Sequence, residues 1–194
     1  MLVAVAYKIR EGGGAIWLDG AIAQHLHPHI GPRRTRLAVT LTQIGSPYFI
    51  VPATLAAALI SAFVRRSIWT GIVVTATVGL VGLASTVGKQ VITAAHPQSA
   101  PHIQVPLAHT FPSGHVAAAL SLMGIVAIAC GAKPRQIFIW LGIAAITAIV
   151  AATRIYLGVH WFSDTLGGVF LGCSAVFFGA ALLPDRSGPG RSPP

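Results

Sequence analysis

The chain has 194 residues, of which 54% are hydrophobic and only 9% are charged, and its mean hydropathy is +0.75. Soluble globular domains carry roughly 25% charged residues, so this composition excludes an ordinary soluble domain and indicates a membrane protein with several spans. The net charge is +9, and the basic residues are scattered between apolar runs. This distribution disfavours nucleic-acid binding, while the positive charge fits loops facing anionic lipid or a site that receives an anion.

The N-terminal region combines a short amphipathic stretch with a polar connection. Apolar and polar residues alternate in a rough helical pattern between residues 15 and 26, which predicts a helix lying at the membrane interface. The sequence from His25 through His27 and His29 to Pro32-Arg33-Arg34 predicts a loop. A metal site at the three histidines is the alternative, but their alternate spacing favours a solvated connection.

Five uncharged apolar segments follow, each near the roughly 17 to 25 residues that a spanning helix needs: residues 47–64, 68–88, 116–132, 136–153 and 165–183. They predict an all-α fold, a multi-span transmembrane bundle of five helices beside the N-terminal interfacial helix. A sixth span is expected only if the chain extends further upstream.

The same pattern divides the chain into three parts. We expect an interfacial segment and loop over residues 1–46, a transmembrane domain over 47–183, and a disordered tail rich in Pro, Gly and Ser over 184–194. Cys130 and Cys173 lie inside apolar runs, and we interpret them as small buried hydrophobic residues rather than a disulfide or metal pair.

The loops alternate between two sides of the membrane. One side carries Arg65-Arg66, Lys133, Arg135 and the tail; the other carries the polar clusters around Lys89, His115, Arg154 and His160. If the first set faces the cytoplasm, the polar clusters are extracytoplasmic. The arginines of the N-terminal region fall on the same side as the clusters, so a count of positive residues does not decide the orientation by itself.

The first polar cluster begins with Lys89, which ends the second apolar segment and is followed by His96 and Pro97. An ammonium group at that depth either extends towards water or faces an anion. Taken alone, Lys89 favours the first interpretation.

The second cluster, from Thr110 to His115, reads Thr-Phe-Pro-Ser-Gly-His. Pro112 and Gly114 predict a turn, and Ser113 offers a hydroxyl group just before a helix. Unpaired N–H groups at a helix start bind anions, and His115 would then be placed to give a proton to a leaving oxygen. The alternative is that Ser113 only caps the helix and His115 is an interfacial histidine.

The third cluster contains Thr153-Arg154, His160 and Asp164. Because His160 and Asp164 are four residues apart, they can share one helix face, and the carboxylate can orient the imidazole as a nucleophile or base. The guanidinium of Arg154 can bind phosphate oxygens in bidentate fashion. The structural alternatives are that Arg154 anchors its helix at the interface and that Asp164 caps the next helix.

Together the three clusters resemble the type-2 phosphatidic acid phosphatase family. Its signature is Lys, six residues and Arg-Pro; then Pro-Ser-Gly-His; then Ser-Arg, five residues, His, three residues and Asp. The second motif matches fully, as do Arg154, His160 and Asp164 at the family spacing. His96 stands where the family has Arg, which removes a permanently charged group, and Thr153 replaces Ser but keeps a hydroxyl.

The resemblance implies an integral-membrane lipid phosphate phosphatase. His160 would attack phosphorus to give a phosphohistidine, oriented by Asp164, and His115 would protonate the leaving group and later activate water. The phosphate oxygens would be held by Lys89, Ser113, the Gly114 N–H, Arg154 and, less surely, His96. The resemblance implies no metal or other cofactor; the expected partners are membrane lipids and a substrate such as phosphatidate, phosphatidylglycerol phosphate or a polyprenyl pyrophosphate.

Other functions fit part of the pattern. A lipid phosphotransferase of the same family would pass the phosphoryl group to an alcohol, and a non-catalytic lipid-binding or transport protein would explain His96. A zinc hydrolase could use His115, His160 and Asp164, whereas the scarcity of acids, four in all, disfavours a two-metal phosphatase. A haloperoxidase-like role is disfavoured because those relatives are soluble.

Overall fold

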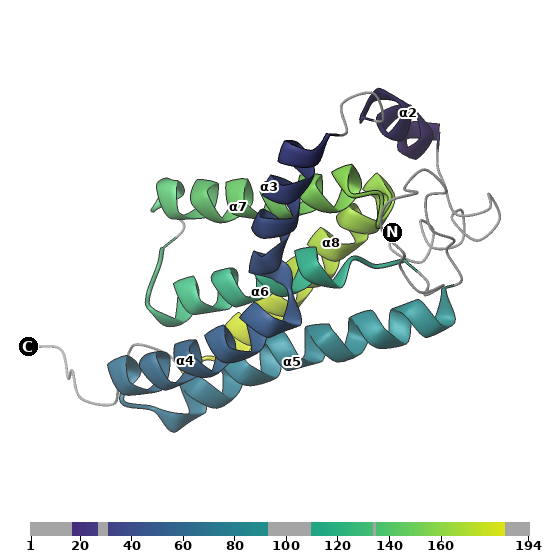
Figure 1. The fold of residues 1–194 in the computed structure, drawn as a ribbon. Helices are drawn as coiled ribbons and strands as arrows, with labels where there is room; N and C mark the ends of the chain where they lie inside the picture. Colours follow the sequence, from purple (N-terminus) through teal and green to yellow (C-terminus); the bar gives the residue numbers. More distant parts are fainter. Residues whose placement is uncertain (1–16, 27–30, 93–109, 134, 185–194) are drawn as a thin grey trace, which may run out of the picture.

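A computed structural model describes residues 17–26, 31–92, 110–133 and 135–184, and within these ranges the chain is helical without any strand. The elements are α2 (Trp17–Leu26), α3 (Pro32–Thr42), the short 3-10 helix η2 (Gln43–Gly45), α4 (Pro47–Arg65), α5 (Ile68–Val91), α6 (Gly114–Ala129), α7 (Ile137–Tyr156) and α8 (Phe162–Leu182). Helices α4 to α8 form the bundle, while α2 and α3 lie towards one end of it (Figure 1).

The five apolar segments predicted from the sequence are helices α4 to α8, and no end differs from the prediction by more than three residues. Length and hydropathy suit four helices for crossing a membrane: the 34-residue stretch Pro32–Arg65, α5, α7 and α8. Helix α6 is apolar but has only 16 residues. The predicted multi-span helical bundle is therefore confirmed.

The predicted loop at Pro32–Arg34 is wrong, because these residues begin α3. Proline suits the first helical turn, where its missing N–H would have no partner and its φ is already helical. The helix is held by packing: Ala38 lies with Leu157 and Val159 in a small buried cluster. His27 and His29 of the alternative metal site lie outside the described residues.

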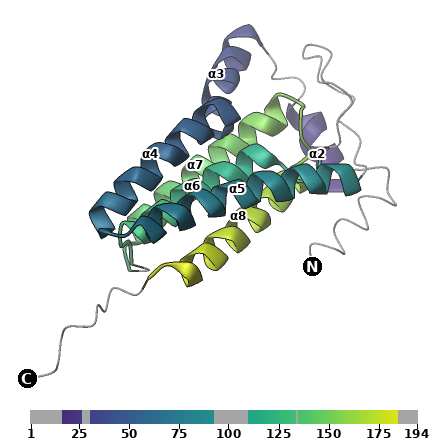
Figure 2. The same ribbon diagram turned by 90° about the horizontal axis from the view of Figure 1, so that it is seen from below.

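The chain bends between α3 and α4 (Figures 1 and 2), where η2 and Pro47 interrupt the regular helix. The bend brings Gly45 against the start of α6. A Cβ atom at Gly45 would lie 2.7 Å from the backbone oxygen of His115, so only glycine permits this approach. The end of α3 and the start of α6 are therefore neighbours.

Helix α6 occupies the centre of the bundle and packs against α4, α5, α7 and α8. Most of its buried residues are Gly, Ala or Ser, and the full set is Val116, Ala117, Ala119, Ser121, Leu122, Gly124, Ile125 and Ala129. In lipid, helices associate by close packing rather than by excluding water, so small residues at the interfaces stabilise the bundle.

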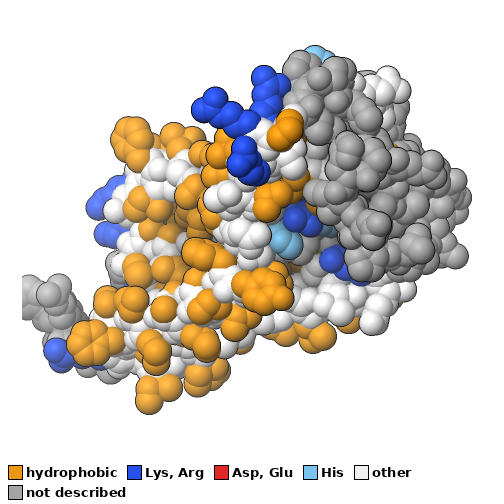
Figure 3. Space-filling model, viewed as in Figure 1, with side chains coloured by type: hydrophobic (Ala, Val, Ile, Leu, Met, Phe, Trp, Pro, Cys, Tyr) orange, Lys and Arg blue, Asp and Glu red, His pale blue; other side chains and the backbone are white. Residues whose placement is uncertain are grey.

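The flank of the bundle exposes large apolar side chains, including Tyr48 (91% exposed), Phe63 (85%) and Phe138 (85%). Figure 3 shows hydrophobic side chains spread over this flank and Lys and Arg side chains at the ends and over α3. At the end formed by the α4–α5 turn, Arg65 donates to the Pro184 oxygen (3.0 Å) and the Trp69 indole to the Leu182 oxygen (2.8 Å). The exposed apolar belt is the surface that lipid covers.

At the opposite end, the segment before α6 lies against the first turns of α8. A Cβ atom at Gly167 would lie 2.5 Å from the ring of Phe111, and one at Gly168 would lie 2.6 Å from the Ser113 backbone oxygen. The Ser113 N–H also donates to the backbone oxygen of Asp164 over 3.0 Å. These contacts fix residues 111–113, called the Ser113 segment below, on α8.

We expect Gly168→Ala to lower the unfolding temperature in detergent, with a loss of about 1 to 3 kcal/mol, because the added methyl group must displace the Ser113 backbone. Gly142→Ala is the matched control, since no atom lies within 4 Å of its Cβ position and alanine favours helix by about 1 kcal/mol. Equal unfolding temperatures for the two variants would show that the Ser113 segment is not held in this way.

Candidate active site

Five chain segments meet at this end of the bundle: the end of α5 with Lys89, the start of α6 with Ser113 to His115, the end of α7 with Arg154, the turn with His160, and the start of α8 with Asp164. Figure 1 shows these helix ends together, opposite the α4–α5 turn. Seven of the eight predicted site residues lie here, and the eighth, His96, lies outside the described residues.

His160 and Asp164 form a buried pair at the start of α8. His160 Nδ1 lies 3.4 Å from Asp164 Oδ2, and the same oxygen accepts the Trp161 N–H over 2.9 Å. His160 is 5% exposed and Asp164 is fully buried. The two interpretations of Asp164 therefore both apply, since its carboxylate caps α8 and also faces the imidazole.

The environment of His160 favours its neutral form. Burial lowers the pKa of His160 below its ordinary value of 6.5, and the positive charges of Arg154 and Lys89 lower it further, while the hydrogen bond and charge of Asp164 raise it. In the tautomer that donates from Nδ1 to Asp164, the lone pair is on Nε2. At neutral pH the imidazole is thus neutral rather than a cation, as a nucleophile requires.

The turn before His160 depends on Gly158. Its φ of 67° is in the left-handed region that favours glycine. The Gly158 N–H donates to the Ile155 oxygen (2.9 Å) and the Val159 N–H to the Arg154 oxygen (3.2 Å), which ends α7 and reverses the chain. The reversal returns His160 to the neighbourhood of Arg154.

Arg154 is held by a residue that the sequence did not single out. Its Nη1 donates to Thr42 Oγ1 over 3.4 Å, and Thr42 is buried at the end of α3. Arg154 Nε is buried and has no hydrogen-bond partner among the described residues. A buried guanidinium N–H without a partner is costly, so this group is available to an anion.

Ser113 precedes α6, but its side chain does not cap the helix. It is fully buried, makes no capping hydrogen bond, and its Oγ has no partner among the described residues. The first N–H groups of α6 have no intrahelical partner. The Ser113 hydroxyl and the first N–H groups of α6 are therefore donors of the kind that bind an anion.

Positive charge dominates this space. The charges of Arg154 and Asp164 act on Lys89, and His115 lies within the fields of Arg154, His160 and Lys89. Repulsion between these groups is strong in a region of low dielectric constant. A bound phosphate dianion would offset this repulsion, so we expect the cluster to bind an anion.

The described residues include no group of three or more His, Cys, Asp or Glu side chains that could hold a metal ion. His115, His160 and Asp164 thus do not form the ligand set that the zinc alternative requires.

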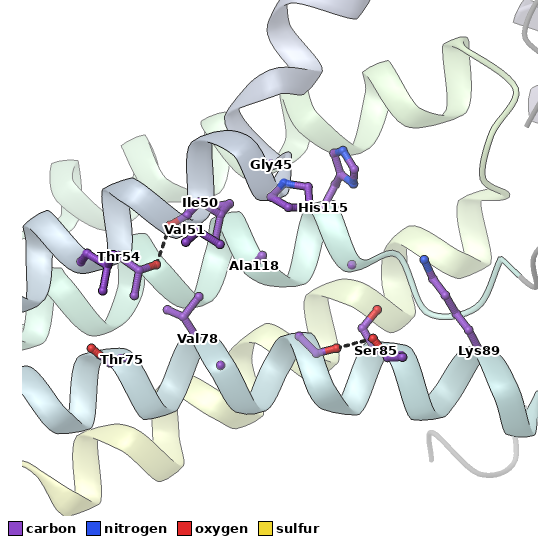
Figure 4. Close-up of a pocket in the computed structure, with 16 residues that line it drawn as sticks. Gly45, Ile50, Val51, Thr54, Thr75, Val78, Ser85, Lys89, His115 and Ala118 are labelled. Atoms are coloured by element: carbon purple, nitrogen blue, oxygen red, sulfur yellow. Dashed lines mark hydrogen bonds between the residues drawn. The ribbon is translucent and has the colours of Figure 1, made fainter.

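A cavity of about 450 Å³ lies along α4 and α5, and three of the predicted site residues line it, Lys89, Gly114 and His115. Lys89 and His115 stand at one end of it, and Thr54 and Thr75 at the other (Figure 4). Between them the walls are mainly apolar, formed by Ile50, Val51, Leu55, Val78, Gly79 and Gly82. The cavity joins a cationic end to an apolar channel at the flank of the bundle.

Known proteins similar to this chain come from one family of phosphatases. The family model of the PAP2 superfamily matches residues 70–187. Phosphatidylglycerophosphatase B of Bacillus subtilis (strain 168) is 29% identical over 146 residues, which cover 71% of this chain and 69% of that protein. The match to the family includes all three polar clusters.

Two solved structures share the fold. The first transmembrane PAP2 type phosphatidylglycerolphosphate phosphatase from Bacillus subtilis superposes with a TM-score of 0.81 at 23% identity, covering 93% of this chain and 90% of that one. Aquifex aeolicus LpxE superposes with a TM-score of 0.64 at 18% identity, covering 86% and 96%.

We expect the cationic cluster to bind inorganic phosphate, measured by equilibrium dialysis of the detergent-solubilised protein. Arg154→Leu should weaken binding about 10- to 100-fold, because a charge-assisted hydrogen bond contributes about 1.5 to 3 kcal/mol. Arg36→Leu, which removes an exposed arginine of α3, is the control and should leave the Kd unchanged. Equal Kd values for Arg154→Leu and the wild type would contradict this assignment.

Proposed function

The chain belongs to the PAP2 superfamily and is a membrane lipid phosphatase, and we propose that it cleaves a phosphomonoester or pyrophosphate of a lipid through a phosphohistidine on His160. The observation that carries this proposal is the cavity that joins Lys89 and His115 to an apolar channel between α4 and α5. Its shape suits a substrate with an anionic head and a hydrocarbon tail.

Among lipid phosphates, phosphatidylglycerol phosphate is the first substrate to test. A relative that is 29% identical carries the name phosphatidylglycerophosphatase B. Phosphatidate and a polyprenyl pyrophosphate share the required chemistry, a phosphate at headgroup depth on an apolar tail, and belong in the same panel.

In the first proposed step, the lone pair on His160 Nε2 attacks phosphorus while the bond from phosphorus to the leaving oxygen breaks. The Asp164 carboxylate holds Nδ1, 3.4 Å away, and stabilises the positive charge that develops on the ring. His115 gives a proton to the leaving oxygen, which departs as the lipid alcohol or lipid monophosphate.

In the second step, His115 takes a proton from water, the water oxygen attacks phosphorus, and the bond to Nε2 breaks to release phosphate. Negative charge on the equatorial oxygens is held by Lys89, the Ser113 hydroxyl, the Gly114 N–H and Arg154. These donors belong to helix ends and a buried turn, which supports the proposal because a preorganised site needs little reorganisation in the transition state. His96 remains a proposed further donor.

We also propose that the site faces the extracytoplasmic side. The opposite end of the bundle carries Arg65, Arg66, Lys133 and Arg135 in its two turns, as cytoplasmic loops do. Lys89 and Arg154 are then read as anion-binding groups rather than as topology signals.

We expect the purified protein in detergent to release phosphate from at least one lipid phosphate of the panel with a chelator present. His160→Ala should lower kcat by about 10³-fold or more, since removing a nucleophile disables the whole chemical route. His25→Ala, an exposed histidine of α2, is the control and should keep full activity.

Rival outcomes of this assay are distinct. Activity that survives His160→Ala would contradict the nucleophile assignment, and activity abolished by the chelator and restored by zinc would favour a metal hydrolase. Turnover that rises with added acceptor alcohols without matching phosphate release would indicate a phosphotransferase.

We expect Gly82→Leu to lower kcat/KM for long-chain lipid phosphates by about tenfold, because the new side chain fills the apolar channel. No atom lies within 4 Å of the Cβ position of Gly82 or of Gly142 on α7, so both positions accept a Cβ atom without a clash. Gly142→Leu, outside the channel, is the matched control. A short-chain analogue should be cleaved equally well by all three proteins, and equal effects of both variants on long-chain substrates would exclude the channel as the tail site.

A further inference from the structure

Helix α2 inserts a carboxylate beside the catalytic pair. Asp19 Oδ1 accepts the Ser163 N–H and Asp19 Oδ2 accepts the Ser163 hydroxyl, both over 2.8 Å. Both side chains are 1% exposed, and Ser163 immediately precedes Asp164. The two views of the fold place α2 at the end of the bundle where α7 ends and α8 begins (Figures 1 and 2).

The two acidic residues of the described chain, Asp19 and Asp164, thus meet at the first turn of α8. A helix start presents several N–H groups without intrahelical partners. Asp164 takes the Trp161 N–H and Asp19 takes the Ser163 N–H. The N–H groups without intrahelical partners are therefore shared between two carboxylates from distant parts of the chain.

The sharing of these N–H groups affects the contact between Asp164 and His160. Without Asp19, the buried N–H and hydroxyl of Ser163 would have no carboxylate of their own, and an unsatisfied buried donor is costly. The Asp164 carboxylate, one residue away, would then be drawn towards them and away from His160 Nδ1. The contact at 3.4 Å is already long for a hydrogen bond, so a small displacement would break it.

We propose that Asp19 is a positioning residue for the reaction: by holding Ser163, it leaves the Asp164 carboxylate to orient His160. The proposed effect is one of position, because the hydrogen bonds of Asp19 go to Ser163, the neighbour of Asp164. Asp19 lies outside residues 70–187, which match the family, so the N-terminal region supplies part of the support of the site. The proposal rests on the proposed function in taking His160 and Asp164 as the reacting pair.

The test compares Asp19→Ala, Asp19→Asn and Ser163→Ala in the full-length protein, with Gln24→Ala on the exposed face of α2 as the control. Asp19→Ala should lower kcat about 10- to 100-fold with KM within about twofold, because the reacting groups are misplaced while substrate binding is kept. Asp19→Asn should stay within about threefold of the wild type, since its amide oxygen accepts the Ser163 N–H and its NH₂ donates to the hydroxyl. Its pH profile should coincide with that of the wild type.

Ser163→Ala keeps the backbone bond to Asp19 and should lose about three- to tenfold in kcat. The double variant Asp19→Ala/Ser163→Ala should lose no more than Asp19→Ala, because both changes break the same connection. Wild-type kcat in Asp19→Ala, a loss confined to KM, or equal losses in Asp19→Ala and Asp19→Asn would overturn the proposal. If Asp19→Ala does not fold, full kcat in Ser163→Ala would overturn it and the predicted loss would support it.

A second measurement separates this inference from the proposed function. The Nδ1–H proton of His160, identified by NMR through its loss in His160→Ala, reports the contact with Asp164 whether or not the protein releases phosphate. It should persist in Asp19→Asn and disappear in Asp19→Ala. A wild-type protein without phosphatase activity would contradict the proposed function alone, whereas an unchanged resonance in Asp19→Ala would overturn the role of Asp19.

Discussion

The position of one buried carboxylate controls the arrangement of the site. Burying an ionised carboxylate costs several kcal/mol unless it has partners, and Asp164 has the Trp161 N–H and the His160 imidazole on one oxygen. Its backbone oxygen also receives the Ser113 N–H. A single residue therefore sets the start of α8, the orientation of the imidazole and the place of the segment that precedes α6.

The excess of positive charge around this carboxylate has a structural consequence. The charges of Lys89 and Arg154 share a region shielded from water with two histidines, like charges repel strongly there, and within the described chain Asp164 is the carboxylate that acts on His160. Neighbouring residues outside the cationic cluster contact the site: Thr42 accepts a hydrogen bond from Arg154, and Asp19 accepts one from Ser163. Under the proposed function, a bound phosphate dianion would supply the negative charge that offsets Lys89 and Arg154.

The membrane surroundings explain why the helices around the site pack closely through small residues. The bundle exposes apolar side chains on its flank and packs through small residues inside, because lipid gives no hydrophobic drive for helix association. Close approach at Gly168 brings the Ser113 segment against α8, and close approach at Gly45 brings η2 against His115 at the start of α6. The lack of a side chain at Gly82 also leaves the channel open, and there a lipid tail can lie next to the cationic end.

The sequence alone determined the helices and the motif. Apolar length is a local property, so α4 to α8 were predicted within three residues of their ends, and the spacing of Arg154, His160 and Asp164 indicated phosphate chemistry. Tertiary structure decided what no local pattern carries: that Pro32 begins a helix, that Thr42 reaches Arg154, and that Asp19 reaches Ser163. Those two contacts join residues 112 and 144 positions apart. Each depends on how the helices pack, so the residues that hold the site become visible only once the helix ends meet.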